Sequence, residues 1–177
     1  LLLLGRKNTS KKNREIIELT KNIFDNYSID LIYAIPSQKN WPKELETALG
    51  ICKDIPHVSL YELSIEKHSY FYDKYKDYSP PDFFDITHGI MSQHGFDHYE
   101  ISNYARNKLF SKHNMLYWLY NDFIGIGAGA FGRITENGKR YETKEENIIQ
   151  KWLKASPIKT AISKRHQDIE KLLMGLR

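Results

Sequence analysis

Residues 27–34, YSIDLIYA, form a short and mostly apolar run that is rich in residues with high β-propensity. Such a run is typical of a buried strand in a parallel sheet. A second run of the same character, HVSLYELSI, occupies residues 57–65. The sequence therefore predicts two strands of one sheet, with a turn of proline, serine and asparagine after the first strand.

Helical segments separate these strands. A helix is expected from Thr9 or Ser10, either of which can cap it, to about Phe24. A second helix begins at Trp41-Pro42, where proline suits the first turn, and a third spans about residues 81–94 and ends at Gly95. Helices of this length between strands are typical of parallel β/α units, so the predicted fold class is α/β.

The last part of the sequence predicts smaller elements. In chain order we expect a strand at residues 99–103, a mostly irregular stretch at 104–122 and a strand at 123–130. A hairpin that turns at Asn137-Gly138 follows. We then expect an amphipathic helix from Thr143 to Ser156-Pro157 and a last helix from about Ser163. The sequence contains no internal repeat.

Length and composition are those of a globular protein. The 177 residues suffice for one medium-sized domain, and a hydrophobic fraction of 41% with a charged fraction of 27% argues against wholesale disorder. The net charge of +4 is spread along the chain, which predicts a solvated basic surface and no nucleic-acid partner. Leu1–Leu4 is too short for a signal peptide or a membrane span, and we interpret it as part of a core strand or helix.

Cys52 is the only cysteine. A disulfide within the chain is therefore impossible, which fits a reducing cytoplasm. One thiolate is also too few for an iron–sulfur cluster or a structural zinc site, and no two histidines have metal-binding spacing inside a convincing helix. We expect a cytoplasmic protein whose chain does not supply cluster ligands of its own.

Residues near the carboxyl ends of the predicted strands are candidates for a site, because functional groups of α/β folds gather there. These candidates are Asp30, Tyr33, Pro36, Gln38, Glu62, Ser64, Glu66 and Glu100. Asp30 lies inside a strand, where it either accepts hydrogen bonds from a ribose or an amine or pairs with a structural partner. Glu62 and Glu66 would share one strand face, which fits either acid–base chemistry or solvation.

The richest chemistry lies in residues 98–132. The segment HNMLYW, residues 113–118, combines an imidazole, an amide and two large aromatic rings, which suits a flat ligand that needs an axial nitrogen, such as haem. The alternative is a histidine bonded to a backbone carbonyl beside an aromatic cluster. The segment GIGAGAFG, residues 125–132, lacks the context of a dinucleotide-binding fingerprint and indicates close approach of the backbone to a neighbouring strand or to a flat ligand.

A series of segments resembles one known family. The segments are LGRKN, IDLIYAIPSQ, HVSLYELSIE, YEISNYA, HNMLYW and GIGAGAFG, followed by RYE and LLMGLR. They are similar to the HemW family, which comprises radical-SAM-like haem chaperones related to oxygen-independent coproporphyrinogen III oxidase. The resemblance covers nearly the whole chain, but the CxxxCxxC loop and the GGGTP motif of the family lie N-terminal to anything present here.

The resemblance implies a fold and a domain division. Residues 1–142 would form the C-terminal half of a partial (β/α) radical-SAM barrel. Residues 143–177 would hold a linker and the first helices of a truncated HemN-type C-terminal domain. The chain is expected to be a fragment, and a complementary N-terminal fragment is an implied partner.

The resemblance also implies site residues. Positions that contact S-adenosylmethionine in the oxidase relatives match Arg6, Asp30, Ser64 and Phe131. The HNxxYW motif, implicated in haem binding, matches His113, Asn114, Tyr117 and Trp118, with His113 as the implied ligand of the haem iron. Ala34 stands where relatives have glycine, and no catalytic residue is assigned.

The implied function is that of a haem chaperone, which binds haem and passes it to an acceptor protein such as a membrane respiratory complex. Full-length members also bind S-adenosylmethionine and a [4Fe–4S] cluster. One alternative is a radical enzyme, coproporphyrinogen III dehydrogenase, against which HNxxYW and the missing cluster cysteines both argue. Another is a split-gene product without activity, because a half-barrel exposes a strand edge and apolar surface.

Overall fold

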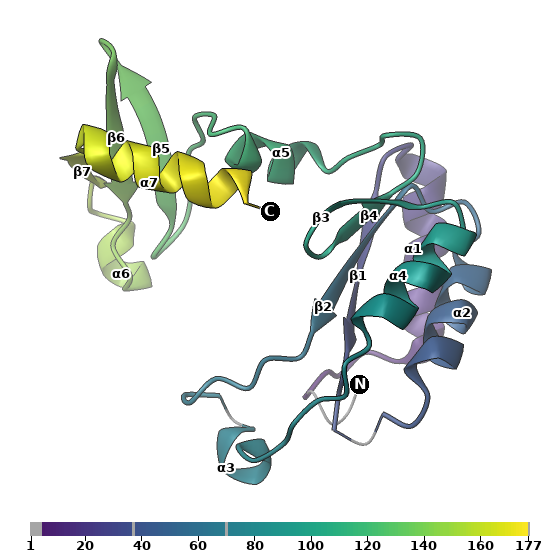
Figure 1. The fold of residues 1–177 in the computed structure, drawn as a ribbon. Helices are drawn as coiled ribbons and strands as arrows, with labels where there is room; N and C mark the ends of the chain where they lie inside the picture. The colour runs from purple at the N-terminus through teal and green to yellow at the C-terminus, as the bar shows by residue number, and fades with distance from the viewer. Residues whose placement is uncertain (1–4, 37, 70, 177) are drawn as a thin grey trace. The chain divides into compact units, whose positions relative to one another are not determined.

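The computed structural model describes residues 5–36, 38–69 and 71–176. The chain divides into two compact units, Leu1–Phe110 and Ser111–Arg177 (Figure 1). The expectation for Leu1–Leu4 lies outside the described residues. Each unit has its own sheet and its own helices.

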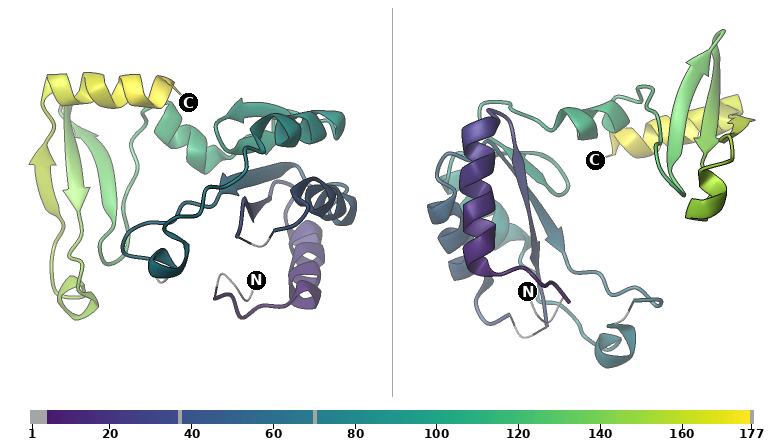
Figure 2. Two further views of the ribbon diagram at one scale, coloured as in Figure 1. Left: turned by 60° about the horizontal axis from the view of Figure 1, so that its bottom comes forward. Right: turned by 180° about the vertical axis from the view of Figure 1, so that it is seen from behind.

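The first unit contains a four-stranded sheet with helices on one side (Figures 1 and 2). The strand order is β1 (Ser28–Tyr33), β2 (His57–Glu62), β4 (Asn103–Ala105) and β3 (Asp97–Glu100). The helices are α1 (Ser10–Ile23), α2 (Trp41–Ile51) and α4 (Phe84–Gln93), and a single turn, α3 (Tyr72–Tyr75), precedes α4. The two apolar runs at residues 27–34 and 57–65 thus form β1 and β2, which pair as parallel strands, as predicted.

The core of this unit lies between the sheet and the helices. Ile29 pairs with Val58 and Leu31 with Leu60, so alternate residues of β1 and β2 face α2 and α4. Trp41 anchors α2, since its indole Nε1 donates to Thr87 Oγ1 on α4 at 2.8 Å and its ring stacks on Tyr33. Thr9 caps α1, as one of the two predicted cap residues, and its side chain accepts a hydrogen bond from the Lys12 amide.

The turn after β1 has a backbone constraint. Ala34 is fully buried and has φ of +55°, in the left-handed region that favours glycine. A residue with a Cβ is strained in this conformation, and glycine would adopt it without strain.

The predicted strand at residues 99–103 is wrong in one respect. The chain forms a hairpin there, with β3 and β4 antiparallel and a turn at Ile101-Ser102. The β4 strand lies between β2 and β3 and is antiparallel to both. The β3 strand is therefore parallel to β2, as expected for a strand that follows α4, but it is not the immediate neighbour of β2. The turn was not predicted because Ile101 is not a typical turn residue.

The second unit contains a three-stranded antiparallel sheet and three helices. Its strands, in order, are β5 (Phe131–Glu136), β6 (Lys139–Lys144) and β7 (Ile158–Ala161), and its helices are α5 (Lys112–Trp118), α6 (Ile149–Trp152) and α7 (Lys164–Gly175). Asn137 and Gly138 have φ of +51° and +72°, as the predicted hairpin turn requires. Ser163 caps α7 through its side chain, also as predicted.

Two expectations for the second unit are wrong, and one helix was not predicted. Residues 104–122 are irregular over more than half of their length, as expected, but they include the α5 helix, which Ser111 caps. Residues 123–130 do not form a strand, because Gly127 and Gly129 have positive φ and only Phe123 bridges to Arg133. The helix expected from Thr143 is a single turn, α6, since β6 continues to Lys144 and residues 158–161 form β7. The domain boundary expected between residues 142 and 143 falls inside β6, and that division stays a prediction.

Arg106 ties two helix ends to the sheet. Its guanidinium donates to the carbonyl of His94 through Nε at 3.1 Å and Nη2 at 2.9 Å, and to the carbonyl of Lys53 through Nη1. Its carbon Cζ lies 4.1 Å from the centre of the Phe96 ring. These carbonyls follow α4 and α2, where a cation also complements the helix dipole.

We predict that Arg106→Ala lowers the free energy of unfolding by about 2–3 kcal/mol, because two charge-assisted acceptors and one cation–π contact are lost together. Urea denaturation followed by circular dichroism measures the change. Arg14→Ala, on the exposed surface of α1, is the matched control, with an expected change below about 0.5 kcal/mol. Equal stability of the two variants would contradict this role of Arg106.

Candidate functional site

The sheet face opposite the helices of the first unit is polar. His57 and Ser59 alternate with the core residues Val58 and Leu60, so they point away from the helices. Hydrogen bonds of 2.7 Å join His57 Nδ1 to Ser28 Oγ and His57 Nε2 to Tyr99 Oη, which links β1, β2 and β3. His57 is 2% exposed. Burial lowers the pKa of its imidazole, and the nearby Asp30 carboxylate opposes this shift.

A depression of about 370 Å³ runs along β1 and brings two predicted residues together. Arg6 and Asp30 both line it, with Asn8, Asn13 and isoleucines of α1 and β1. Asp30 is exposed, so the cost expected for a carboxylate inside a buried strand does not arise. A guanidinium and a carboxylate around one depression can hold a ligand that carries both an acidic group and hydroxyl or amino groups.

The other two residues matched to S-adenosylmethionine contacts are not among the residues that line this depression. Ser64 follows the end of β2 and its hydroxyl donates to Glu66 Oε1 at 3.1 Å. Phe131 begins β5 in the second unit. Glu62 is the last residue of β2 and Glu66 lies beyond it, so the expected shared strand face is wrong. The roles of Arg6, Asp30, Ser64 and Phe131 stay predictions.

The HNMLYW segment of the second unit forms α5, which places His113 and Tyr117 one helical turn apart. His113 is exposed, and its ring meets the Tyr117 ring edge-on with centroids 4.9 Å apart. Tyr117 in turn packs edge-on against Phe123 at 4.5 Å and lies near Trp118 at 6.4 Å. Asn114 is half-buried and its backbone amide donates to the Ser111 cap. The motif therefore presents an imidazole beside an aromatic wall.

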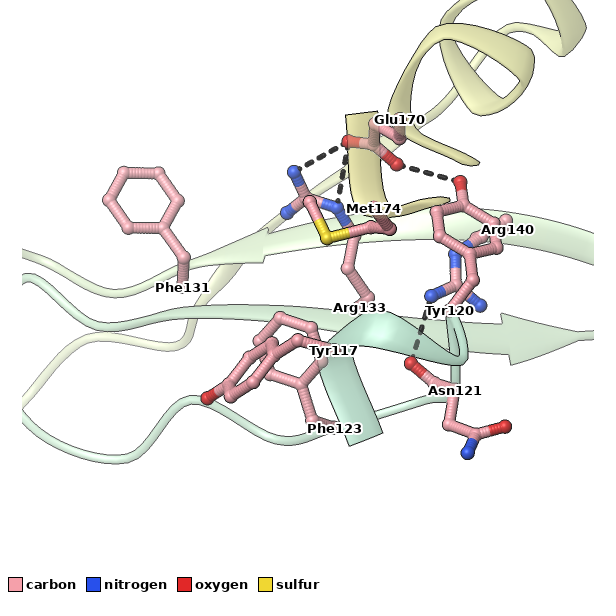
Figure 3. A pocket seen from close by; sticks show the side chains of 9 residues that line it. All are labelled: Tyr117, Tyr120, Asn121, Phe123, Phe131, Arg133, Arg140, Glu170 and Met174. Atoms are coloured by element: carbon pink, nitrogen blue, oxygen red, sulfur yellow. Dashed lines mark hydrogen bonds and ion pairs between the residues drawn. The ribbon is translucent and has the colours of Figure 1, made fainter. Parts of the chain in front are cut away.

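A cavity of about 200 Å³ adjoins this wall (Figure 3). Its lining consists of Tyr117, Tyr120, Asn121, Phe123, Phe131, Arg133, Arg140, Glu170 and Met174. The aromatic rings and the Met174 thioether make most of its surface apolar. The cavity is thus built from α5, the β5–β6 hairpin, the segment between α5 and β5, and α7.

The two arginines of the cavity are paired with carboxylates. Arg133 contacts Glu170 at 2.9 Å and Glu142 at 3.0 Å. Arg140 contacts Asp122 at 2.7 Å, and its guanidinium carbon lies 3.9 Å from the centre of the Tyr120 ring. The positive charge of both guanidinium groups is therefore compensated within the unit.

Glu170 connects α7 to this network. It accepts hydrogen bonds from Arg133 and from Tyr120 Oη, the latter at 2.7 Å (Figure 3). Burial, together with the bond to Glu170, raises the pKa of Tyr120 to about 12, so the phenol stays protonated as a donor. Burial raises the pKa of Glu170, but the hydrogen bonds from Arg133 and Tyr120 outweigh it, and the net pKa shift is downward.

The glycines of GIGAGAFG allow close approach within the chain itself. A Cβ on Gly125 would collide with the Phe131 backbone, and one on Gly132 would collide with the Thr143 side chain and with the backbone of Phe123 and Gly125. For these two glycines the structure selects the first of the expected alternatives, approach to a neighbouring segment. Ile124 and Ile126, between the glycines, are 77% and 83% exposed.

A cluster site does not form in the described part of the chain. No group of three His, Cys, Asp or Glu side chains that could hold a metal ion occurs among the described residues. Cys52 is buried at the end of α2, and burial raises the pKa of its thiol, so it does not fit the role of a cluster ligand. None of the described helices is long and apolar enough to cross a membrane.

Comparison with known sequences gives one family. No protein-family model matches the chain. The haem chaperone HemW of Lactococcus lactis is 33% identical to it over 188 residues, which cover 98% of this chain and 48% of that protein. The mitochondrial radical S-adenosyl methionine domain-containing protein 1 of Danio rerio is 31% identical over 202 residues, which cover 100% of this chain and 44% of that protein. The chain belongs to the HemW-like radical-SAM family.

A solved structure agrees with this assignment at the level of the fold. Coproporphyrinogen III oxidase (HemN) from Escherichia coli matches with a TM-score of 0.71 over 97% of this chain and 46% of that chain, at 15% identity. The match confirms the predicted fold class, part of a radical-SAM α/β barrel fold. The chain spans about half the length of the curated relatives that it matches. Because several relatives are named as mitochondrial, the cytoplasmic location stays a prediction.

Several residues of both sites were not predicted from the sequence. His57 and Tyr99 lack a recognisable motif, and their contact depends on the fold. Arg133 was predictable in part, because the Asn137-Gly138 turn sets a register that places it opposite Glu142. Glu170 follows Arg133 by 37 residues, and no local pattern indicates their contact.

We predict that His57 makes the stability of the first unit depend on pH. Its folded pKa lies below the unfolded value of about 6.5, so the unfolded state binds the proton more readily. The free energy of unfolding is therefore highest above pH 6.5, falls as the pH drops through 6.5 toward the folded pKa, and then levels off. Urea denaturation at pH 5 to 8 should show a smaller fall for His57→Gln than for the original chain. His166→Gln, which changes an exposed histidine, should leave the fall unchanged.

Proposed function

We propose that this chain binds haem through the second unit and passes it to an acceptor protein. The observation that carries the proposal is the exposed His113 imidazole, held edge-on against Tyr117 at the start of an aromatic wall. A neutral imidazole is a common axial ligand of haem iron, and aromatic rings suit the faces of a porphyrin. Among the described residues, no hydrogen bond engages the His113 ring, so its nitrogens are available to a ligand.

Relatives support the same function. The protein of Lactococcus lactis carries the name haem chaperone, and so does the protein of Bacillus subtilis, which is 35% identical over 74% of this chain. An exposed histidine also fits a chaperone, since cargo held at the surface can be transferred to another protein. The acceptor would be a haem-binding protein, such as a membrane respiratory complex.

S-adenosylmethionine is the second ligand that we propose, in the depression along β1. Arg6 offers donors for a carboxylate, and Asp30 offers acceptors for hydroxyl or ammonium groups. The chain does not fit a [4Fe–4S] cluster, whose cysteines would come from a complementary N-terminal segment or partner. Such a partner would also pair with the outer edge of β1, which is the end strand of its sheet.

A radical enzyme of haem biosynthesis is the alternative function. The observation that favours it is that Arg6 and Asp30 share one depression, as the two would in an S-adenosylmethionine site. Formation of 5′-deoxyadenosine after reconstitution with iron, sulfide, a reductant and S-adenosylmethionine would establish this alternative for the chain.

We predict that haem added to the purified chain gives a shifted Soret band, and that His113→Ala weakens haem binding by about tenfold or more because the axial nitrogen is lost. Absorbance titration measures the affinity. His166→Ala removes an exposed histidine from α7 in the same unit and should bind haem as the original chain does. Identical titrations of the original chain and His113→Ala would exclude His113 as the ligand.

A further inference from the structure

The cavity beside Tyr117 is too small for a whole porphyrin. Its volume of about 200 Å³ lies below the roughly 300–1,000 Å³ of pockets that enclose a drug-sized ligand. A large flat ligand can therefore place only one edge in it. The chemical groups on that edge of the ligand therefore decide which ligands the cavity accepts.

The cavity lies next to the proposed haem ligand. Tyr117 meets the His113 ring with one edge and contributes to the cavity lining, and Phe123 packs against Tyr117 as the next part of the wall. A flat ligand held by His113 along this wall can therefore reach the cavity, because Tyr117 borders both. Figure 3 shows Tyr117 and Phe123 together on one side of the cavity and Phe131 apart from them.

Charge makes the interior unsuitable for a carboxylate. Arg133 and Arg140 already pair with three carboxylates, those of Asp122, Glu142 and Glu170. A carboxylate that entered would lose its hydration without gaining an uncompensated cation, which is unfavourable.

Two lysines contact rings that line the cavity but do not line it themselves. Lys144 has its ammonium 5.4 Å from the centre of the Phe131 ring, and Lys171 has its ammonium 5.3 Å from the centre of the Tyr120 ring. Both lysines are exposed. A porphyrin can therefore keep its carboxylates in water near these lysines while an apolar edge is buried.

We propose that the cavity receives the vinyl-bearing edge of haem, and that it selects haem over iron porphyrins that carry a carboxylate on every pyrrole ring. Haem has two adjacent pyrrole rings with only methyl and vinyl groups, so one edge is free of charge. Iron coproporphyrin III has a propionate on each ring and no such edge. This inference rests on the proposed binding of haem at His113.

The test compares two porphyrins and two variants of α7. Met174→Trp fills the cavity with a bulky ring, and Leu173→Trp places the same ring at the neighbouring position, which is 54% exposed and does not line the cavity. Haem and iron coproporphyrin III are each titrated into the original chain and both variants, with the Soret band as the readout. Circular dichroism confirms that the variants are folded.

We expect the original chain to bind haem about tenfold more tightly than iron coproporphyrin III, the size of effect that burial of two small apolar groups gives. Met174→Trp should lose this preference by weakening haem alone, and Leu173→Trp should keep it. Equal affinities in the original chain, or an unchanged preference in folded Met174→Trp, would overturn the inference while His113-dependent haem binding stands. Failure of the original chain to bind either porphyrin would instead remove the proposed function and this inference with it.

A second measurement needs no variant. Deuterohaem has hydrogen in place of both vinyl groups and keeps the two propionates of haem. It should bind to the original chain several-fold more weakly than haem, because less apolar surface is buried. Equal affinities for haem and deuterohaem would overturn the inference even if Met174→Trp did not fold.

Discussion

The parallel register of β1 and β2 is the constraint on which the first unit depends. It sets Ile29 beside Val58 and Leu31 beside Leu60, which commits one face of the sheet to the helices. A shift by one residue would send these side chains to the opposite face and turn Asp30 toward the core, where a carboxylate is costly. The same register places Ser28 beside His57. The polar face and the apolar core are therefore two results of one pairing.

The second unit depends more on paired charges than on a large core. Among the described residues of this unit, Arg140 is the one buried polar side chain, and it pairs with Asp122 on the preceding segment. Arg133 holds Glu170 of α7, so the helix is attached to the sheet by an ion pair that is largely shielded from water. Such a pair fixes geometry more than it adds stability, since desolvation offsets much of the attraction. It keeps the cavity walls in place.

The elements that carry strong local signals could be predicted from the sequence. Thr9, Ser163 and the Asn137-Gly138 turn mark boundaries that the structure confirms, and the apolar runs of β1 and β2 were sufficient to predict parallel pairing. Elements with weak signals were missed. The β3–β4 turn uses Ile101, and the seven residues of α5 are too few for a helical pattern to stand out.

In the candidate sites, too, features with a strong local signal were predicted from the sequence and features without one were not. The HNMLYW segment was noticed because its residue types lie together in the sequence, and its role came from family resemblance rather than from spacing. The contacts of His57 with Ser28 and Tyr99, and of Arg133 with Glu170, join residues 29 to 42 positions apart in the first unit and 37 apart in the second. Local periodicity carries no information on such contacts, which follow from the completed fold.

The buried Cys52 is a natural chemical probe for the opening of one of the two units. It is the only thiol in the chain and is 5% exposed, packed where α2 meets the core of the first unit. A thiol reagent can reach it only when that packing opens, and the second unit has no thiol to contribute to the signal. The rate of alkylation under native conditions therefore reports the opening of the first unit alone and does not depend on whether the second unit opens.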